Sequence, residues 1–101
     1  MADIKKEISG TTMNIALGGI LDTKSAPQLQ DAIMESVADV TEINIDMAQL
    51  EYLTSAGLRA ILVAQQEMDD KDGKMTLKHV AKEIIDIFKM TGFLSILTIE
   101  D

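Results

Sequence analysis

The stretch YLTSAGLR, residues 52–59, is the part of the sequence that best indicates the fold. It joins the apolar end of a predicted strand to the start of a predicted helix, and Ser55 lies at the junction. We expect Ser55 to be the N-cap, because its side-chain oxygen can accept a backbone N–H that the first helical turn leaves unpaired. Ala56 and Gly57 are small, so the surface around the hydroxyl is expected to be open. A phosphate on Ser55 would be favoured at the positive end of the helix dipole, which makes this junction a candidate switch.

Alternating apolar residues predict the strands. The alternation covers residues 13–17, 43–47 and 75–77, and a last short strand is expected over 96–99. Gly18 and Gly19 interrupt the first of these strands and indicate a bulge or bend.

Between these strands, the apolar residues recur at the spacing of a helix. Ser25–Gln28 fits a capping box with Pro27 in the first turn, and the apolar positions 29, 33 and 37 then recur every four residues, with 34 flanking them. A second helix is predicted from residue 56 to about 70, with Gly73 in the left-handed position after it. A third is predicted from residue 81 and ends at Gly92.

Strands that alternate with helices of this length predict an α/β fold in one domain over residues 1–101. Right-handed crossovers imply a mixed, largely parallel sheet of four to five strands with about three main helices. The strand or hairpin before residue 22 is expected to run antiparallel at one edge.

Composition limits the classes of partner. The chain is 47% hydrophobic, has only 3% aromatic residues and carries a formal charge of −8, so its core is aliphatic and it is not expected to bind nucleic acid or anionic membranes. It has no cysteine, which excludes disulfides and thiolate zinc sites. The N-terminal residues do not form a secretory signal and no apolar run is long enough to span a membrane, so a cytoplasmic module is expected.

No catalytic constellation can be assembled, and the protein is not expected to be an enzyme. His79 is the single histidine and is expected to be a strand-end or surface residue, so Ser55 has no evident base partner. Residues 69–73 resemble a calcium loop only superficially and are expected to end a helix. The carboxylates of Glu7, Asp22, Asp46 and Glu51 would be catalytic only if folding gathered them. No cofactor or metal is expected.

Three segments together carry a family resemblance. Residues 19–22, 45–58 and 88–93 follow one another in the order and spacing found in the STAS domain family. The chain resembles in particular the small bacterial anti-sigma factor antagonists of that family, over nearly its whole length. Thr54 stands where such proteins commonly have Asp, and Ile20 stands where Glu is usual.

The resemblance implies a regulatory role in sigma-factor-dependent transcription. In such proteins the unphosphorylated antagonist binds an anti-sigma factor, often itself a serine kinase, and phosphorylation releases it; a PP2C-type phosphatase reverses the change. The matching phosphorylation site here is Ser55, with Thr54 as a competing acceptor. The positions matched as partner-binding or loop-shaping residues are Asp22, Asp46, Thr54, Ala56, Gly57 and Arg59.

Two other functions stay open at the level of sequence. The first is a STAS subunit that holds a transporter or signalling complex together without phosphotransfer, and the second is a small-ligand or nucleotide sensor. Ile87 and Met90 flank the apolar face of the third helix, and either add to an exposed patch for a partner or widen the buried stripe.

Overall fold

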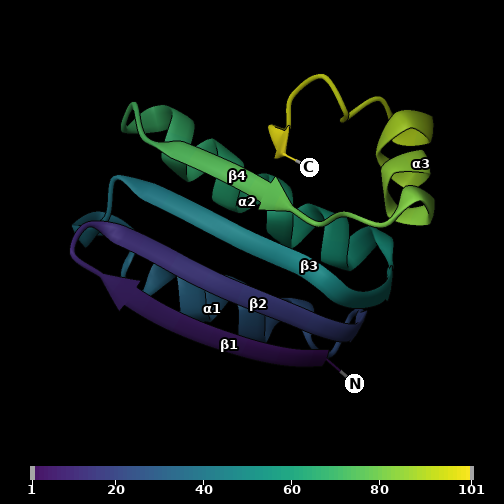
Figure 1. Ribbon diagram of the computed structural model, residues 1–101, viewed down its shortest axis with the longest axis horizontal. Coiled ribbons are helices and arrows are strands. Elements are labelled where there is room, and N and C mark those ends of the chain that lie inside the picture. Colours follow the sequence, from purple (N-terminus) through teal and green to yellow (C-terminus); the bar gives the residue numbers. More distant parts are fainter. Residues whose placement is uncertain (1, 101) are drawn as a thin grey trace.

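A computed structural model describes residues 2–100 of the chain. Within them, five strands form one sheet whose spatial order is the order of the sequence (Figure 1). The strands are β1 (Ala2–Ser9), β2 (Thr12–Leu21), β3 (Glu42–Leu53), β4 (Lys74–Lys78) and β5 (Ile99–Glu100). The helices are α1 (Ala26–Met34), the short 3₁₀ helix η1 (Val37–Asp39), α2 (Ser55–Asp70) and α3 (Lys82–Thr91).

The sheet is mixed, as the sequence predicts. β1 lies at one edge and pairs with β2 antiparallel, whereas β2, β3, β4 and β5 pair in parallel. The expected α/β fold with a leading antiparallel strand is therefore confirmed. Because β2 and β3 are parallel, their carboxyl ends meet at one end of the sheet, and α1 and α2 begin there.

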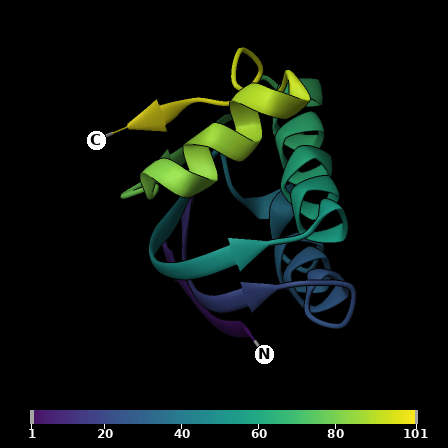
Figure 2. The same ribbon diagram turned by 90° about the vertical axis from the view of Figure 1, so that its right-hand side faces the viewer.

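Helices α1 and α2 pack side by side against one face of the sheet (Figures 1 and 2). The alternating apolar residues of β2, β3 and β4 are buried between the layers, and all are at most 2% exposed: Met13, Ile15, Leu17, Ile43, Ile45, Met47, Met75 and Leu77. The opposite face of β1, β2 and β3 carries polar side chains. The core is thus largely aliphatic, with Phe88 of α3 also fully buried in it. Helix α3 lies beyond the carboxyl end of β4, on the side of the sheet away from β1 (Figure 1).

The predicted bulge in β2 is confirmed. The register between β2 and β3 shifts between Ala16 and Gly18 and again between Gly19 and Ile20. Gly19 has φ +76°, a left-handed conformation that favours glycine. The irregularity changes which residues face outward near the end of β2, so Ile20 is 39% exposed whereas Leu21 is fully buried.

Two predicted element boundaries were wrong. α1 ends at Met34, which is 44% exposed, and Val37 belongs to η1. The last strand begins only at Ile99, because the N–H groups of Ile96 and Leu97 bond the carbonyl of Phe93 in a turn.

The left-handed residue after α2 is Asp72, with φ +58°, and not Gly73. Gly73 is needed for a different reason: a Cβ there would lie 2.7 Å from Cε of Met68 and 3.1 Å from the Thr41 carbonyl oxygen. The prediction for α3 is confirmed, since Gly92 ends it with φ +81°. Met90 is 83% exposed whereas Ile87 is half-buried against the core.

Candidate functional site

The junction between β3 and α2 is built around Thr54. Its backbone is extended (ψ 178°), its N–H donates to the Leu21 carbonyl at 2.9 Å, and its Oγ1 accepts the N–H of Gly57 at 3.5 Å. These are the features of an N-cap residue. The prediction that Ser55 caps α2 was therefore wrong by one residue, because Ser55 is already the first residue of the helix.

This shift separates the roles of two adjacent hydroxyls. Thr54 is half-buried, and its Oγ1 also lies 3.5 Å from the Leu21 carbonyl oxygen. The Ser55 side chain is exposed, and no hydrogen bond engages its hydroxyl among the residues that the structure describes. Ser55 therefore presents the free hydroxyl of the junction, whereas the hydroxyl of Thr54 serves the fold.

Gly57 lets α2 approach the end of β2 closely. A Cβ at this position would lie 2.5 Å from the Leu21 carbonyl oxygen, closer than real Cβ contacts come. The same carbonyl accepts the Thr54 N–H, so a single peptide group of β2 positions the first turn of α2. The expectation of an open surface holds only in part, since Gly57 is buried and Ala56 is half-buried.

Asp22 and Ser25 fix the neighbouring junction, where β2 ends and the chain turns into α1. The Asp22 carboxylate accepts the backbone N–H groups of Lys24 and Ser25, both at 3.0 Å, while Ser25 Oγ accepts the Asp22 N–H at 2.9 Å. This is a reciprocal capping box one turn earlier than the predicted box at Ser25–Gln28. Ser25 itself makes no cap bond for the later turn, so that prediction was wrong.

The same hydrogen bonds act on the charge of Asp22. Donation from the backbone and side chain of Ser25 holds the pKa of the Asp22 carboxyl below its usual value. Because Asp22 follows Leu21 directly, its turn also orients the peptide that receives Thr54. Asp22 thus directly follows the residue whose carbonyl receives the Thr54 N–H, and its loop-shaping role stays a prediction.

Asp46 lies elsewhere. It is in the middle of β3, and the seven residues that follow it in that strand correspond to roughly 20 Å of extended chain before the junction. Its carboxylate accepts the Ala48 N–H at 2.9 Å and lies 3.2 Å from Nδ1 of His79. The hydrogen bond from the Ala48 N–H lowers the pKa of the Asp46 carboxyl, and the interaction with His79 lowers it further. The expectation that Asp46 lies near the loop was wrong, whereas His79 is an exposed strand-end residue as predicted.

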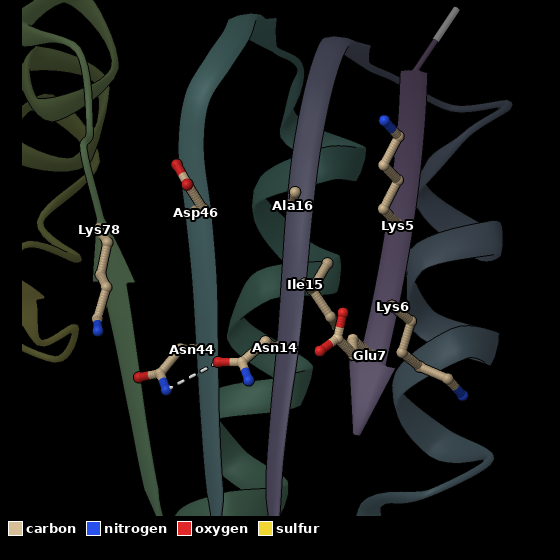
Figure 3. Close-up of a pocket in the computed structure, with 9 residues that line it drawn as sticks. All are labelled: Lys5, Lys6, Glu7, Asn14, Ile15, Ala16, Asn44, Asp46 and Lys78. Carbon is tan, nitrogen blue, oxygen red and sulfur yellow. Dashed lines mark hydrogen bonds between the residues drawn. The ribbon is translucent and has the colours of Figure 1, made fainter. Parts of the chain in front are cut away.

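Asp46 instead lines a groove of about 410 Å³ on the open face of the sheet (Figure 3). Asn14 and Asn44 lie in register on β2 and β3, and the Asn44 amide donates to Asn14 at 3.1 Å. The four carboxylates considered in the sequence are therefore not gathered in one place. Glu7 and Asp46 face this groove, and Asp22 lies at the end of β2.

Two exposed apolar residues lie close to the junction in the sheet. Ile20 and Tyr52 are register partners on β2 and β3 and are 39% and 53% exposed. The sequence did not single them out as a surface pair, because an apolar residue at the end of a strand is expected to be buried. The two shifts in register before Tyr52 turn both of them outward.

The sequence matches the family described as the STAS domain over residues 3–101. The chain belongs to the STAS domain family. BtrV of Bordetella bronchiseptica, which is named as an anti-sigma factor antagonist, is 28% identical over 81 residues, which cover 79% of this chain and 70% of BtrV. The anti-sigma-B factor antagonist of Bacillus subtilis is 25% identical over 97 residues, which cover 96% of this chain and 87% of that protein.

Solved structures show the same STAS fold. The unphosphorylated form of the anti-sigma factor antagonist SpoIIAA superposes with a TM-score of 0.81 at 20% identity, and the match covers 98% of this chain and 88% of SpoIIAA. An anti-sigma factor antagonist from Mycobacterium paratuberculosis gives a TM-score of 0.85 at 21% identity and covers 98% and 85% of the two chains. Among the helices within residues 2–100, none has the length and apolarity to cross a bilayer.

Proposed function

We propose that this STAS protein is an anti-sigma factor antagonist whose binding to its anti-sigma factor is controlled by phosphorylation of Ser55. The observation that carries the proposal is the exposed, uncommitted Ser55 hydroxyl at the start of α2, beside a Thr54 hydroxyl that caps the helix. The names of related proteins support it, because three relatives are named anti-sigma-B factor antagonists and SpoIIAA has been solved in phosphorylated form.

The proposed modification transfers a phosphoryl group from ATP to Ser55. A bond forms between Ser55 Oγ and the terminal phosphorus, the bond from that phosphorus to the bridging oxygen of ADP breaks, and the hydroxyl proton passes to a base of the kinase. In this proposal the kinase is the anti-sigma factor itself, and a PP2C-type phosphatase hydrolyses the ester in the bacterial cytoplasm. The half-buried Thr54 is the poorer acceptor because its hydroxyl contacts both Leu21 and Gly57.

The switch is electrostatic. A phosphate adds about −1.5 to −2 charges at neutral pH, and the amino end of α2 tolerates an anion in the free protein. A bound partner would remove water from that charge. Burying a charge that the interface does not compensate costs on the order of 3–5 kcal/mol, which corresponds to a loss of roughly two to three powers of ten in affinity. The fold itself is not expected to change.

The test compares Ser55→Ala and Ser55→Asp for binding to the anti-sigma factor encoded in the same genome, measured by titration calorimetry. Ser55→Ala is expected to bind like the wild type, and Ser55→Asp at least tenfold more weakly. Ser9→Asp is the matched control, because it adds the same charge at an exposed serine. Ser9 ends β1 beside the start of β2, at the opposite end of the sheet from the junction. Equal binding by Ser55→Ala and Ser55→Asp would refute control by charge and favour a constitutive interaction subunit.

A kinase assay tests the acceptor directly. The anti-sigma factor with ATP is expected to phosphorylate the wild type and Thr54→Val, and to leave Ser55→Ala unmodified, with the phosphate mapped by peptide mass spectrometry. Phosphate on Thr54 in the wild type would contradict the assignment of Ser55.

A further inference from the structure

The single arginine of the chain lies in the same part of α2 as Ser55. Arg59 is exposed and follows Ser55 by four residues, so the two side chains lie on one stripe of the helix. The residues between them turn toward the core, since Gly57 and Leu58 are buried. The exposed surface at the start of α2 therefore presents the Ser55 hydroxyl and the Arg59 guanidinium.

Arg59 has no interaction within residues 2–100 that would give its guanidinium a role in the fold. No hydrogen bond or ion pair engages it within residues 2–100. Its helical neighbours three and four positions away are all uncharged: Ser55, Ala56, Leu62 and Val63. A cation near the amino end of a helix is opposed by the helix dipole, so its position does not stabilise α2.

Three lysines of the chain differ in this respect. Lys6 donates to the Ala32 carbonyl and pairs with Glu35 at 3.1 Å, and Lys78 lies 3.6 Å from Glu100. Lys71 donates to the Val40 carbonyl at 2.6 Å. Arg59 is thus a guanidinium held on the surface without an internal anion, in a protein whose net charge is −8.

We propose that the anion bound by Arg59 depends on whether Ser55 is phosphorylated. Arg59 binds a carboxylate of the partner while Ser55 has a free hydroxyl, and it pairs with the phosphate within α2 once Ser55 is phosphorylated. This inference rests on the proposed function and names the residue through which the switch acts. Phosphorylation then has two effects on the partner. It adds an anion to the interface, and it removes the cation that the partner's carboxylate had used.

Helix geometry supports both states. Side chains four residues apart have their Cβ atoms about 5–6 Å from each other, a distance that a phosphate and a guanidinium can close. The planar guanidinium binds either a carboxylate or a phosphate through two parallel N–H···O bonds. The two anions compete for the same donors, so capture of Arg59 by the phosphate excludes its use by the partner.

The first experiment tests capture without any kinase or partner. Phosphoserine is introduced at position 55 during translation, and the second pKa of the phosphate is measured by ³¹P NMR in three backgrounds. The pKa is expected to be lower with Arg59 than in Arg59→Gln by about 0.2–0.4 units, the size of an exposed helical ion pair. Lys82→Gln, which removes an exposed cation at the start of α3, is expected to match the background with Arg59. Identical titration with and without Arg59 would overturn the capture step.

The second experiment tests the partner's carboxylate by a double-mutant cycle of binding to the anti-sigma factor. Arg59→Gln is expected to weaken binding of the unphosphorylated protein about tenfold, as expected for a hydrogen bond to a charged group. Arg59→Lys is expected to restore part of the loss, and Lys82→Gln to change nothing. In the Ser55→Asp background, Arg59→Gln is expected to weaken binding less, because the aspartate at position 55 already forms an ion pair with the guanidinium.

The outcomes separate this inference from the proposed function. Equal effects of Arg59→Gln in both backgrounds would overturn the coupling between Ser55 and Arg59 while leaving phosphorylation control intact. A wild-type protein that binds no anti-sigma factor would refute the proposed function and the carboxylate step together. The phosphate titration still decides capture in that case.

Discussion

Replacing Gly57 by alanine tests the geometry of the junction most directly. Gly57 is helical, with no strained backbone angle, so alanine at an open helical position would stabilise the protein by about 0.5–1 kcal/mol. The space is not open here. The added Cβ would lie 2.5 Å from the Leu21 carbonyl oxygen and 3.0 Å from Leu21 Cγ.

The nearest obstacle is backbone, and this determines the size of the effect. Real Cβ atoms stay at least 3.0 Å from other heavy atoms, so α2 and the end of β2 must separate by about half an ångström or more. Overpacking of this kind costs about 1–3 kcal/mol. The movement also stretches the bond from the Thr54 N–H to Leu21 and weakens a cap of about 1 kcal/mol. After the gain in helix propensity, we expect a net destabilisation of about 1–3 kcal/mol.

Urea unfolding followed by far-UV circular dichroism measures this free energy. The midpoint should fall with an unchanged slope, and each kcal/mol should lower the melting temperature by about 4–8 °C. Ser55→Ala is the matched control, because it also adds alanine to the first turn of α2, at an exposed position. A Gly57→Ala protein at least as stable as the wild type would refute the close approach of α2 to β2.

Two further predictions concern the caps. Thr54→Ala should destabilise the protein by about 0.5–2 kcal/mol, whereas Ser55→Ala should stay within about 0.5 kcal/mol of the wild type in the same urea titration; the reverse order would return the cap to Ser55. Asp22→Asn should be less stable than the wild type at neutral pH. Since the folded pKa of Asp22 lies below its unfolded value near 3.9, its contribution is present above that pH and is lost as the pH falls through the folded pKa. Unfolding curves from pH 7 to pH 2 should therefore converge, and a gap that persists at the lowest pH would contradict the role of the charge.

Much of the fold could be predicted because it depends on local patterns. The alternation through Met13, Ile15 and Leu17 identifies a half-buried strand whichever strands adjoin it, and Gly92 ends α3 because its left-handed angle is a property of one residue. The alternation of strands and helices then permits few arrangements other than a parallel sheet with crossovers. The junction at Ser55 was located correctly for the same reason, since an apolar strand and an amphipathic helix must meet there.

The sequence by itself determined the class of fold, the place of the junction and the presence of two adjacent hydroxyls there. The tertiary structure decided which of two adjacent hydroxyls is free. Thr54 and Ser55 are both competent N-caps, and the choice depends on the Leu21 carbonyl, 33 residues away in the chain, which accepts the Thr54 N–H and holds its backbone extended. Asp46 was misplaced for a related reason, because a position along a strand gives its distance from a loop only once the strand's length is known. Capping and strand length are settled by contacts between β2 and β3, and such contacts are absent from any local pattern.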